Sequence, residues 1–406
     1  MGLALLIATT AGTLASGDEN NLFGYVSDNT TEANTQASCT EDATFSKLGA
    51  NIISGGSGTN NFRFRDAGGD GQQLATRAGA GTCEDTTNTD VLSAGDLFNI
   101  AYTDTGSNSG PAWVKANVEF SSGHGNFHGC ADFSGAVHDV ASATRFLPVV
   151  GTLLTDGQVT EDNVEWKVRG YDSFAGLQVR VTANARTNNS DFQNRIDGGF
   201  GSLLCQFAGG ATGLVIDTSP ADAITDGQTI NASLTLSTGV EDLTVTFVVA
   251  TLKSSSSKSD TFAGRQNGII RTASATANYI PIGGHIHSLT ATTEEQARIK
   301  PGFAAVVSNL RCYLSANTYT GNGTLKLYQN GSAVITTTIT ASGGAAWYEN
   351  TSDTITIDAD DELSFEFDEG TSGSITIHSV GITFAPVAAG GATYVGWGLN
   401  SKGGWW

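Results

Sequence analysis

NLRCYLSANTYTGNGTLKLYQNG, residues 309–331, contains two strand-like segments separated by a turn. An apolar run after Leu310 leads into a stretch of Asn, Thr and Gly, and an alternating segment then ends at Asn330 and Gly331. Alternation of apolar and polar residues is typical of a half-buried strand. Asn and Gly accept the left-handed backbone of a tight turn. The stretch therefore predicts two antiparallel strands.

The same order of features occurs three times along the chain. A Thr-Glu pair ends at Glu32, Glu161 and Glu294, and 16 residues later a leucine opens an apolar run, at Leu48, Leu177 and Leu310. Each copy then has an alternating segment, a polar turn and a closing strand, predicted over residues 113–120, 243–247 and 375–380. Because each glutamate has the same place in its copy, we expect a structural role for it, as a helix cap or a strand-edge contact.

Gly is abundant, Pro is scarce, and few amphipathic helix patterns occur, the best being residues 294–299. Many short strands between turn clusters predict an all-β protein of three tandem β-sandwich domains, jelly-roll-like rather than immunoglobulin-like, with N- and C-terminal arms. The predicted segments are an apolar N-terminal arm (1–20), repeat 1 (21–122), a His/Cys connector (123–140), repeat 2 (141–252), a Ser-rich linker (253–272), repeat 3 (273–386) and a Gly/Trp-rich tail (387–406).

The apolar start of the chain allows three interpretations. One is a signal peptide, because the small residues near Ala15 resemble a cleavage region. A signal peptide would begin with basic residues, however, and none precedes Lys47. The other two are a docking arm and a first strand.

The chain has 20 basic and 40 acidic residues, a net charge of −20. Phosphate recognition needs clustered Lys and Arg, so we expect neither nucleic acid nor an anionic membrane as a partner. Acidity by itself favours solubility. The acidic turns at residues 66–70 and at Asp358, Asp360 and Asp361 also suit calcium, although neither has EF-hand spacing.

The five cysteines are far apart and differently placed in each copy, so no repeated disulfide is expected, and Cys205 and Cys312 are predicted to be core thiols. This usage favours folding in the cytoplasm. Residue types that zinc binds gather at His124, His128, Cys130 and His138, but their spacing fits no zinc module. His285 and His287 are expected to share one strand face.

No GxSxG elbow, P-loop, Rossmann fingerprint or HExxH motif occurs, so we expect a protein that is not an enzyme. Half of the six tryptophans lie in the last ten residues. Exposed tryptophan is costly, so Tyr394, Trp397, Trp405 and Trp406 are predicted to dock on a partner, with packing on their own domains as the alternative.

The repeated pattern, exemplified by residues 309–331, by ENTSDTITIDADDELSF from residue 349 and by GSITIHSVGITF from residue 373, resembles the tandem β-jelly-roll repeats of tailed-phage virion proteins over about residues 23–384. The resemblance implies an exterior virion component, such as a capsid decoration, head fibre or tail fibre, assembled in the host cytoplasm. It also implies a homo-oligomer, most often a trimer, that binds other virion proteins and a host-surface glycan. The alternative is a secreted bacterial adhesin or carbohydrate-binding protein at the cell surface.

Overall fold

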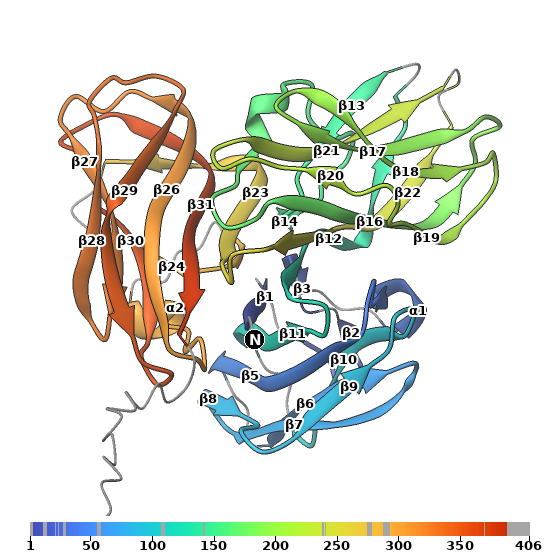
Figure 1. The fold of residues 1–406 in the computed structure, drawn as a ribbon, viewed down its shortest axis with the longest axis horizontal. Coiled ribbons are helices and arrows are strands. Elements are labelled where there is room, and N and C mark those ends of the chain that lie inside the picture. The colour runs from blue at the N-terminus through green and yellow to red at the C-terminus, as the bar shows by residue number, and fades with distance from the viewer. Residues whose placement is uncertain are drawn as a thin grey trace, which may run out of the picture.

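The computed structural model describes residues 3–387 except 11–13, 21, 23, 27–29, 55–57, 107–109, 141–142, 238, 240, 274–277, 287–292 and 369. Nearly all its regular structure is β, in six sheets that pair into three two-sheet bodies (Figure 1). We call β1 to β11 unit 1, β12 to β22 unit 2, and β23 to β31 unit 3. The all-β sandwich architecture expected from the sequence is therefore confirmed.

The elements of the three units follow in chain order. Unit 1 has β1 (Ala4–Thr10), β2 (Glu19–Asn20), β3 (Gly24–Val26), α1 (Glu32–Thr35), β4 (Ala37–Ser38), β5 (Ala43–Ser54), β6 (Thr59–Asp66), β7 (Gly69–Ala78), β8 (Gly81–Glu84), β9 (Thr89–Leu92), β10 (Leu97–Asp104) and β11 (Gly110–Phe120). Unit 2 has β12 (His124–His138), β13 (Thr144–Leu147), β14 (Gly151–Thr152), the 3-10 turn η1 (Glu161–Asn163), β15 (Trp166–Lys167), β16 (Ser173–Asn184), β17 (Ser190–Ile196), β18 (Gly199–Phe207), β19 (Gly213–Asp217), β20 (Asp222–Ala223), β21 (Thr229–Leu236) and β22 (Leu243–Ser254). Unit 3 has β23 (Ser259–Thr272), β24 (Asn278–Ile280), β25 (Gly284–His285), α2 (Glu294–Ala297), β26 (Ala305–Asn317), β27 (Gly323–Gln329), β28 (Ser332–Ile339), β29 (Ala346–Ile357), β30 (Leu363–Asp368) and β31 (Ser374–Pro386).

Each unit has the strand order of a jelly roll. In unit 3 one sheet runs β23-β31-β26-β29 and the other β24-β30-β27-β28. The corresponding orders are β1-β11-β5-β8 and β2-β10-β6-β7 in unit 1, and β12-β22-β16-β19 and β13-β21-β17-β18 in unit 2. We call the sheet with the first and last strands the inner sheet and its partner the outer sheet. Numbered by position within a unit, the inner sheet is 1-8-3-6 and the outer 2-7-4-5, which is a jelly-roll order and not an immunoglobulin-like one.

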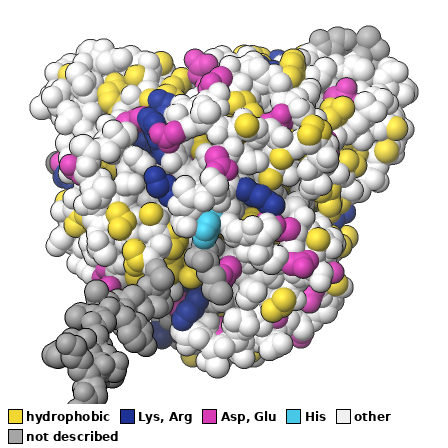
Figure 2. All heavy atoms as spheres, in the orientation of Figure 1, with side chains coloured by type: hydrophobic (Ala, Val, Ile, Leu, Met, Phe, Trp, Pro, Cys, Tyr) yellow, Lys and Arg dark blue, Asp and Glu magenta, His cyan; other side chains and the backbone are white. Residues whose placement is uncertain are grey.

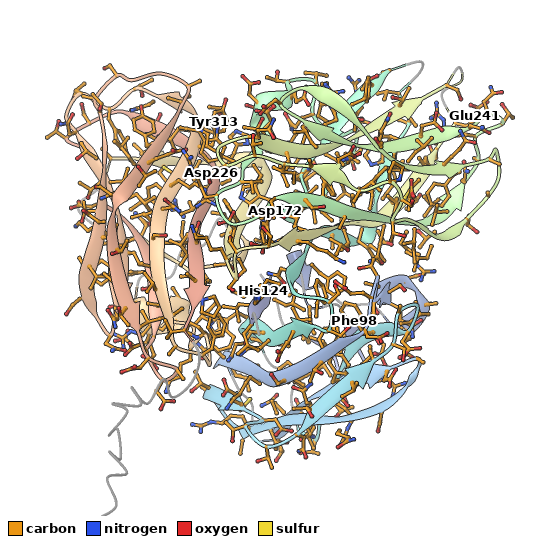
Figure 3. The ribbon with its side chains drawn as sticks, viewed as in Figure 1. Phe98, His124, Asp172, Asp226, Glu241 and Tyr313 are labelled. Carbon is orange, nitrogen blue, oxygen red and sulfur yellow. The ribbon has the colours of Figure 1, made fainter. Side chains whose placement is uncertain are left out.

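The core of each unit lies between its two sheets. In unit 1, Phe45 of the inner sheet lies 4.9 Å from both Phe64 and Phe98 of the outer sheet, centroid to centroid (Figure 3 labels Phe98). Such aromatic pairs add about 0.5–1.5 kcal/mol to the free energy gained by burial. The outer-sheet strands β18 and β28 alternate between buried and exposed residues, as expected for a sheet with one solvated face.

The first strand of every unit corrects the predicted segments. The predicted N-terminal arm (1–20) contains β1, which pairs antiparallel with β11 inside a sheet. Of the three interpretations left open for this segment, the structure shows a first strand. Residues 123–140 are not a connector but contain β12, which pairs with β22. Within 253–272, only the turn around residues 255–258 links two units, and β23 then pairs with β31. The three segments are thus one structural element repeated.

Candidate functional site

The predicted metal ligands lie along one strand without converging. His124, at the start of β12 near the border of units 1 and 2 (Figure 3), is 2.8 Å from the Ser257 hydroxyl. His128 is 2.9 Å from the Tyr171 hydroxyl, and the Cys130 thiol donates to the carbonyl of Pro148 at 2.9 Å. Among the residues that the structure describes, no group of three His, Cys, Asp or Glu side chains could hold a metal ion.

The buried histidines of this strand are neutral. Burial lowers the pKa of His128 to about 3. Burial, with help from Arg145 and Arg186, lowers the pKa of His138 to about 4. His285 is also buried, beside Thr152, whereas its predicted companion His287 lies outside the described residues. These imidazoles are therefore packed within the protein interior.

The acidic turn after β29 is held by its own neighbours. Asp361 accepts hydrogen bonds from the Asp358 amide at 2.7 Å and from the side chains of Gln329 and Asn330, both at 2.6 Å. Burial opposes ionisation of Asp361, but these hydrogen bonds outweigh it and lower its pKa. A calcium site at Asp358, Asp360 and Asp361 stays a prediction.

The other acidic turn, at residues 66–70, is likewise part of an internal network. Arg63 lies 3.6 Å from the carboxylate of Asp70, and Arg65 pairs with the same side chain. Burial, together with Asp96 and Asp90, raises the pKa of Asp66. A raised pKa disfavours the ionised carboxylate that a calcium ion would need.

The recurring glutamates have a structural place, as expected. Each begins a short helical turn, and each pairs with an arginine beside the hairpin turn of the outer sheet: Glu32 with Arg65, Glu161 with Arg195 and Glu294 with Arg298. In the Glu32 pair the two bonds are 3.0 and 3.1 Å long. The threonines before them make no side-chain cap, so the glutamates act through ion pairs rather than as caps.

All five cysteines are free, and Cys205 and Cys312 are fully buried core thiols, as predicted. The predicted docking residues Tyr394, Trp397, Trp405 and Trp406 lie outside the described residues.

A buried ion pair of unit 3, at its contact with unit 2, was not found from the sequence. Arg311 and Asp260 are both 0% exposed, and their charged atoms are 3.0 Å apart. Arg311 also donates to the carbonyl of Lys167 in unit 2 at 2.9 Å. Asp260 accepts the amides of Arg169 and Gly170 at 2.8 and 3.0 Å and the Thr383 hydroxyl at 2.5 Å. The available signal was an arginine inside the apolar run of residues 310–314.

A wide hollow of about 550 Å³ lies where unit 1 approaches unit 2. Its lining includes Asp42, Glu119 and His124, and Val91 at its side is 72% exposed. On the face drawn in Figure 2, acidic and basic side chains are interspersed. In the described part of the chain, no helix is long and apolar enough to cross a membrane.

No protein-family model and no curated protein matches this chain. Among solved structures it is similar to the STIV MCP, a viral major capsid protein (9% identity, 64% of this chain and 96% of that chain, TM-score 0.20). A Paenibacillus xanthan lyase matches at 9% identity over 84% of this chain and 51% of that chain, with a TM-score of 0.18. VP2 of infectious bursal disease virus matches at 9% identity over 90% and 84%, with a TM-score of 0.13. The similar structures thus include both viral capsid proteins and an enzyme. TM-scores this low carry no argument about function.

Proposed function

We propose that this chain is a non-enzymatic structural protein of a virion exterior, a decoration or fibre component that assembles on a phage particle and contacts the host surface. The observation that supports a building role is the way the chain uses its polar groups. Glu349 of unit 3 pairs with Lys167 and Arg169 of unit 2, and the glutamate-arginine pairs brace each unit internally. Three copies of one scaffold are thereby packed into a single body.

The proposed attachment to the particle is through the tail. Tyr394, Trp397, Trp405 and Trp406 would bury their rings on a neighbouring virion protein, as aromatic anchors do at protein interfaces. A chain ending at Val387 should keep the melting temperature of the full chain and lose co-sedimentation with particles. Equal co-sedimentation of the shortened and full chains would assign attachment to another surface.

The function is tested on native particles. Antibodies raised against the full chain should label the outside of virus particles from the source culture in electron micrographs, and the chain should co-purify with them in a density gradient. Finding the chain only in the cell-envelope or secreted fraction would favour a surface adhesin instead. Release of oligosaccharides from a polysaccharide panel would overturn the non-enzymatic assignment.

A further inference from the structure

The three units contact one another in cyclic order through the free faces of their inner sheets. From unit 2, Phe127, Phe247 and Val249 join the apolar cluster of unit 1. From unit 3, Phe262 joins the cluster of unit 2. From unit 1, Leu5, Ile7 and Trp113 join the cluster of unit 3. Units 1 and 2, and units 2 and 3, are consecutive in the chain. Units 1 and 3 are not, so their contact is the one that closes the cycle.

The burial pattern of the inner sheets records these contacts. In β22 ten of twelve residues are buried, in an almost uninterrupted run, and β31 is buried continuously over eight residues. A strand with only one face on a core alternates between buried and exposed residues. Continuous burial therefore means that the second face is covered as well, here by the neighbouring unit.

Polar contacts repeat the same rotation. In units 2 and 3, the residue after the leucine that opens the apolar run contacts the preceding unit. Gln178 bonds the amide and carbonyl of Ser38 at 2.9 and 2.8 Å, and Arg311 bonds the carbonyl of Lys167. Ser38 and Lys167 each lie six residues after the glutamate of their Thr-Glu pair. The contacts made by units 2 and 3 are thus equivalent by position, although the side chains differ.

At the contact between units 1 and 3, different residues occupy the positions that correspond to those described for units 2 and 3. Gly49 takes the place of Gln178 and Arg311, and the space beside it holds Lys115, which is 1% exposed and paired with Glu84. Burial lowers the pKa of Lys115, Glu84 opposes this shift, and the nearby Lys47 and Lys300 reinforce it. Lys300 of unit 3 has the place in its copy that Ser38 and Lys167 have in theirs.

Three short strands meet around the centre of this arrangement. β3, β14 and β25 each pair in parallel with the first strand of their own unit, and each lies next to the other two. A cavity of only about 20 Å³ near this centre is lined from all three units, by Ile7, Gly129 and Phe262 among others. In Figure 1 the three bodies lie around the region where β3 and β14 are labelled.

We propose that this single chain takes the place of a homotrimer: its three units close a ring about a pseudo-threefold axis, and the surfaces that would join three subunits are used within one chain. A head-to-tail interface stops propagating when its rotation closes the ring. The free protein is therefore a monomer.

Solution mass and cross-linking test this proposal. The full chain should run as a monomer of 41.9 kDa at micromolar concentration, and a stable homotrimer would overturn the proposal. A short amine-reactive cross-linker should join Lys47 to Lys300 in that monomer, because a Cβ on Gly302 would lie 3.5 Å from Lys47 Cγ. In a mixture of nitrogen-isotope-labelled and unlabelled chains, this link should form within chains only.

A control variant shows that the cross-link involves the Lys300 amine. Lys300→Arg keeps the positive charge and should abolish the link without altering the mass in solution. A link that is missing in the wild-type monomer, or that joins labelled to unlabelled chains, contradicts ring closure. The outcome is independent of the proposed function, since a ring absent from every virus particle would still give the link.

Discussion

The glutamate of each Thr-Glu pair fixes the hairpin turn of its outer sheet. The turns at Ala67, Asp197 and Asn330 have positive φ values of 48°, 47° and 52°, each followed by a glycine that also has positive φ. Two successive positive φ values fit a tight hairpin turn but are unfavourable for residues with a Cβ. In unit 1, Arg65 links Glu32 to the carbonyl of Gly68, so the ion pair holds the turn in place.

In unit 3 the arginine that pairs with the glutamate comes from a different position in the sequence. Tyr328 stands where units 1 and 2 have Arg65 and Arg195, and Arg298 supplies the guanidinium instead. A Cβ on Gly331 would lie 3.0 Å from the Arg298 Nη2 atom, so this guanidinium also sits against the turn. The charge pair is kept while the residue that provides it changes.

Glu161→Ala should lower the free energy of unfolding by about 1.5–3 kcal/mol, the range for hydrogen bonds to charged groups. Its partner Arg195 is only 8% exposed in its side chain and would lose its carboxylate in a poorly solvated place. Thermal unfolding followed by circular dichroism measures the effect. Asp162→Ala, on the exposed neighbour in the same turn, is the control and should change stability by less than about 0.5 kcal/mol. Equal effects of the two variants would remove the assigned role.

Acid should destabilise the protein before its carboxylates are protonated. His128, His138 and His378 have folded-state pKa values of about 3, 4 and 4, all lowered chiefly by burial. Because the unfolded histidines bind protons near pH 6.5, stability is intact above that pH and falls as the pH drops toward 4. Each such histidine costs up to about 1.4 kcal/mol per pH unit within this window.

One carboxyl works in the opposite direction. Burial raises the pKa of Glu19 to about 7, with Glu32 adding to the shift, so the stability linked to Glu19 is lost as the pH rises from 4.5 to 7. Urea unfolding at pH 6.5 and 4.5 measures the sum. His138→Gln should reduce the loss on acidification and Glu19→Gln should increase it. An unchanged stability between the two pH values in the wild-type chain would contradict this account.

At the scale of elements, the close approach of β14 and β23 depends on glycine. Gly151 has φ +95°, and a Cβ there would overlap the carbonyl group of Gly264 in unit 3. Gly151→Ala should therefore combine backbone strain with a clash between units, costing about 1–3 kcal/mol for the overpacking alone. Chemical denaturation measures the loss.

Gly210 provides the control for that variant. It has a similar positive φ, +74°, but a Cβ there would meet nothing within 4 Å. Gly210→Ala should show only the strain of a left-handed alanine, about 1–2 kcal/mol. If both variants lose the same stability, the contact between β14 and β23 contributes nothing measurable.

The strands that sequence analysis located share one property, which is a regular pattern along their length. The alternation of residues 325–328 and the apolar runs of β22 and β31 follow from burial on one or both faces. The first strands of units 2 and 3, which the sequence analysis missed, lack such a pattern. In β12, Asn126 donates to the carbonyl of Leu5 in unit 1, and a register shift between Ala131 and Ala136 interrupts the alternation of the strand. β23 has the corresponding shift between Gly264 and Ile269.

The candidate sites were less predictable than the fold, because they depend on which distant segments meet. His124, His128 and Cys130 are neighbours in sequence, yet their side chains contact Ser257, Tyr171 and the Pro148 carbonyl separately. Conversely, the equivalence of Gln178 and Arg311 follows from the repeat, but the segment that faces them follows only from the packing of units.

At the scale of the whole molecule, the deepest charges at a contact between units belong to Arg311 and Asp260 of unit 3, which are buried against unit 2. Arg311 has an ion pair, hydrogen bonds to Lys167 and Asn309 and a position 4.4 Å from the ring centre of Phe262, all without exposure to solvent. Removing one member of a buried ion pair leaves the other charge uncompensated. The contact between units 2 and 3 should therefore depend more on this arginine than on any exposed pair around it.

Arg311→Met should lower the free energy of unfolding by about 3–5 kcal/mol, the usual cost of breaking a buried pair. Arg180→Met is the matched control, since Arg180 lies in the equivalent strand of unit 2 and has one 3.4 Å hydrogen bond, to Gln36 of unit 1. It should cost no more than about 1.5 kcal/mol. Calorimetry of both variants also reports how unfolding is coupled: a ring held by three contacts predicts that weakening one lowers the transition of every unit. A separate early transition confined to one unit in Arg311→Met would instead show units that unfold independently.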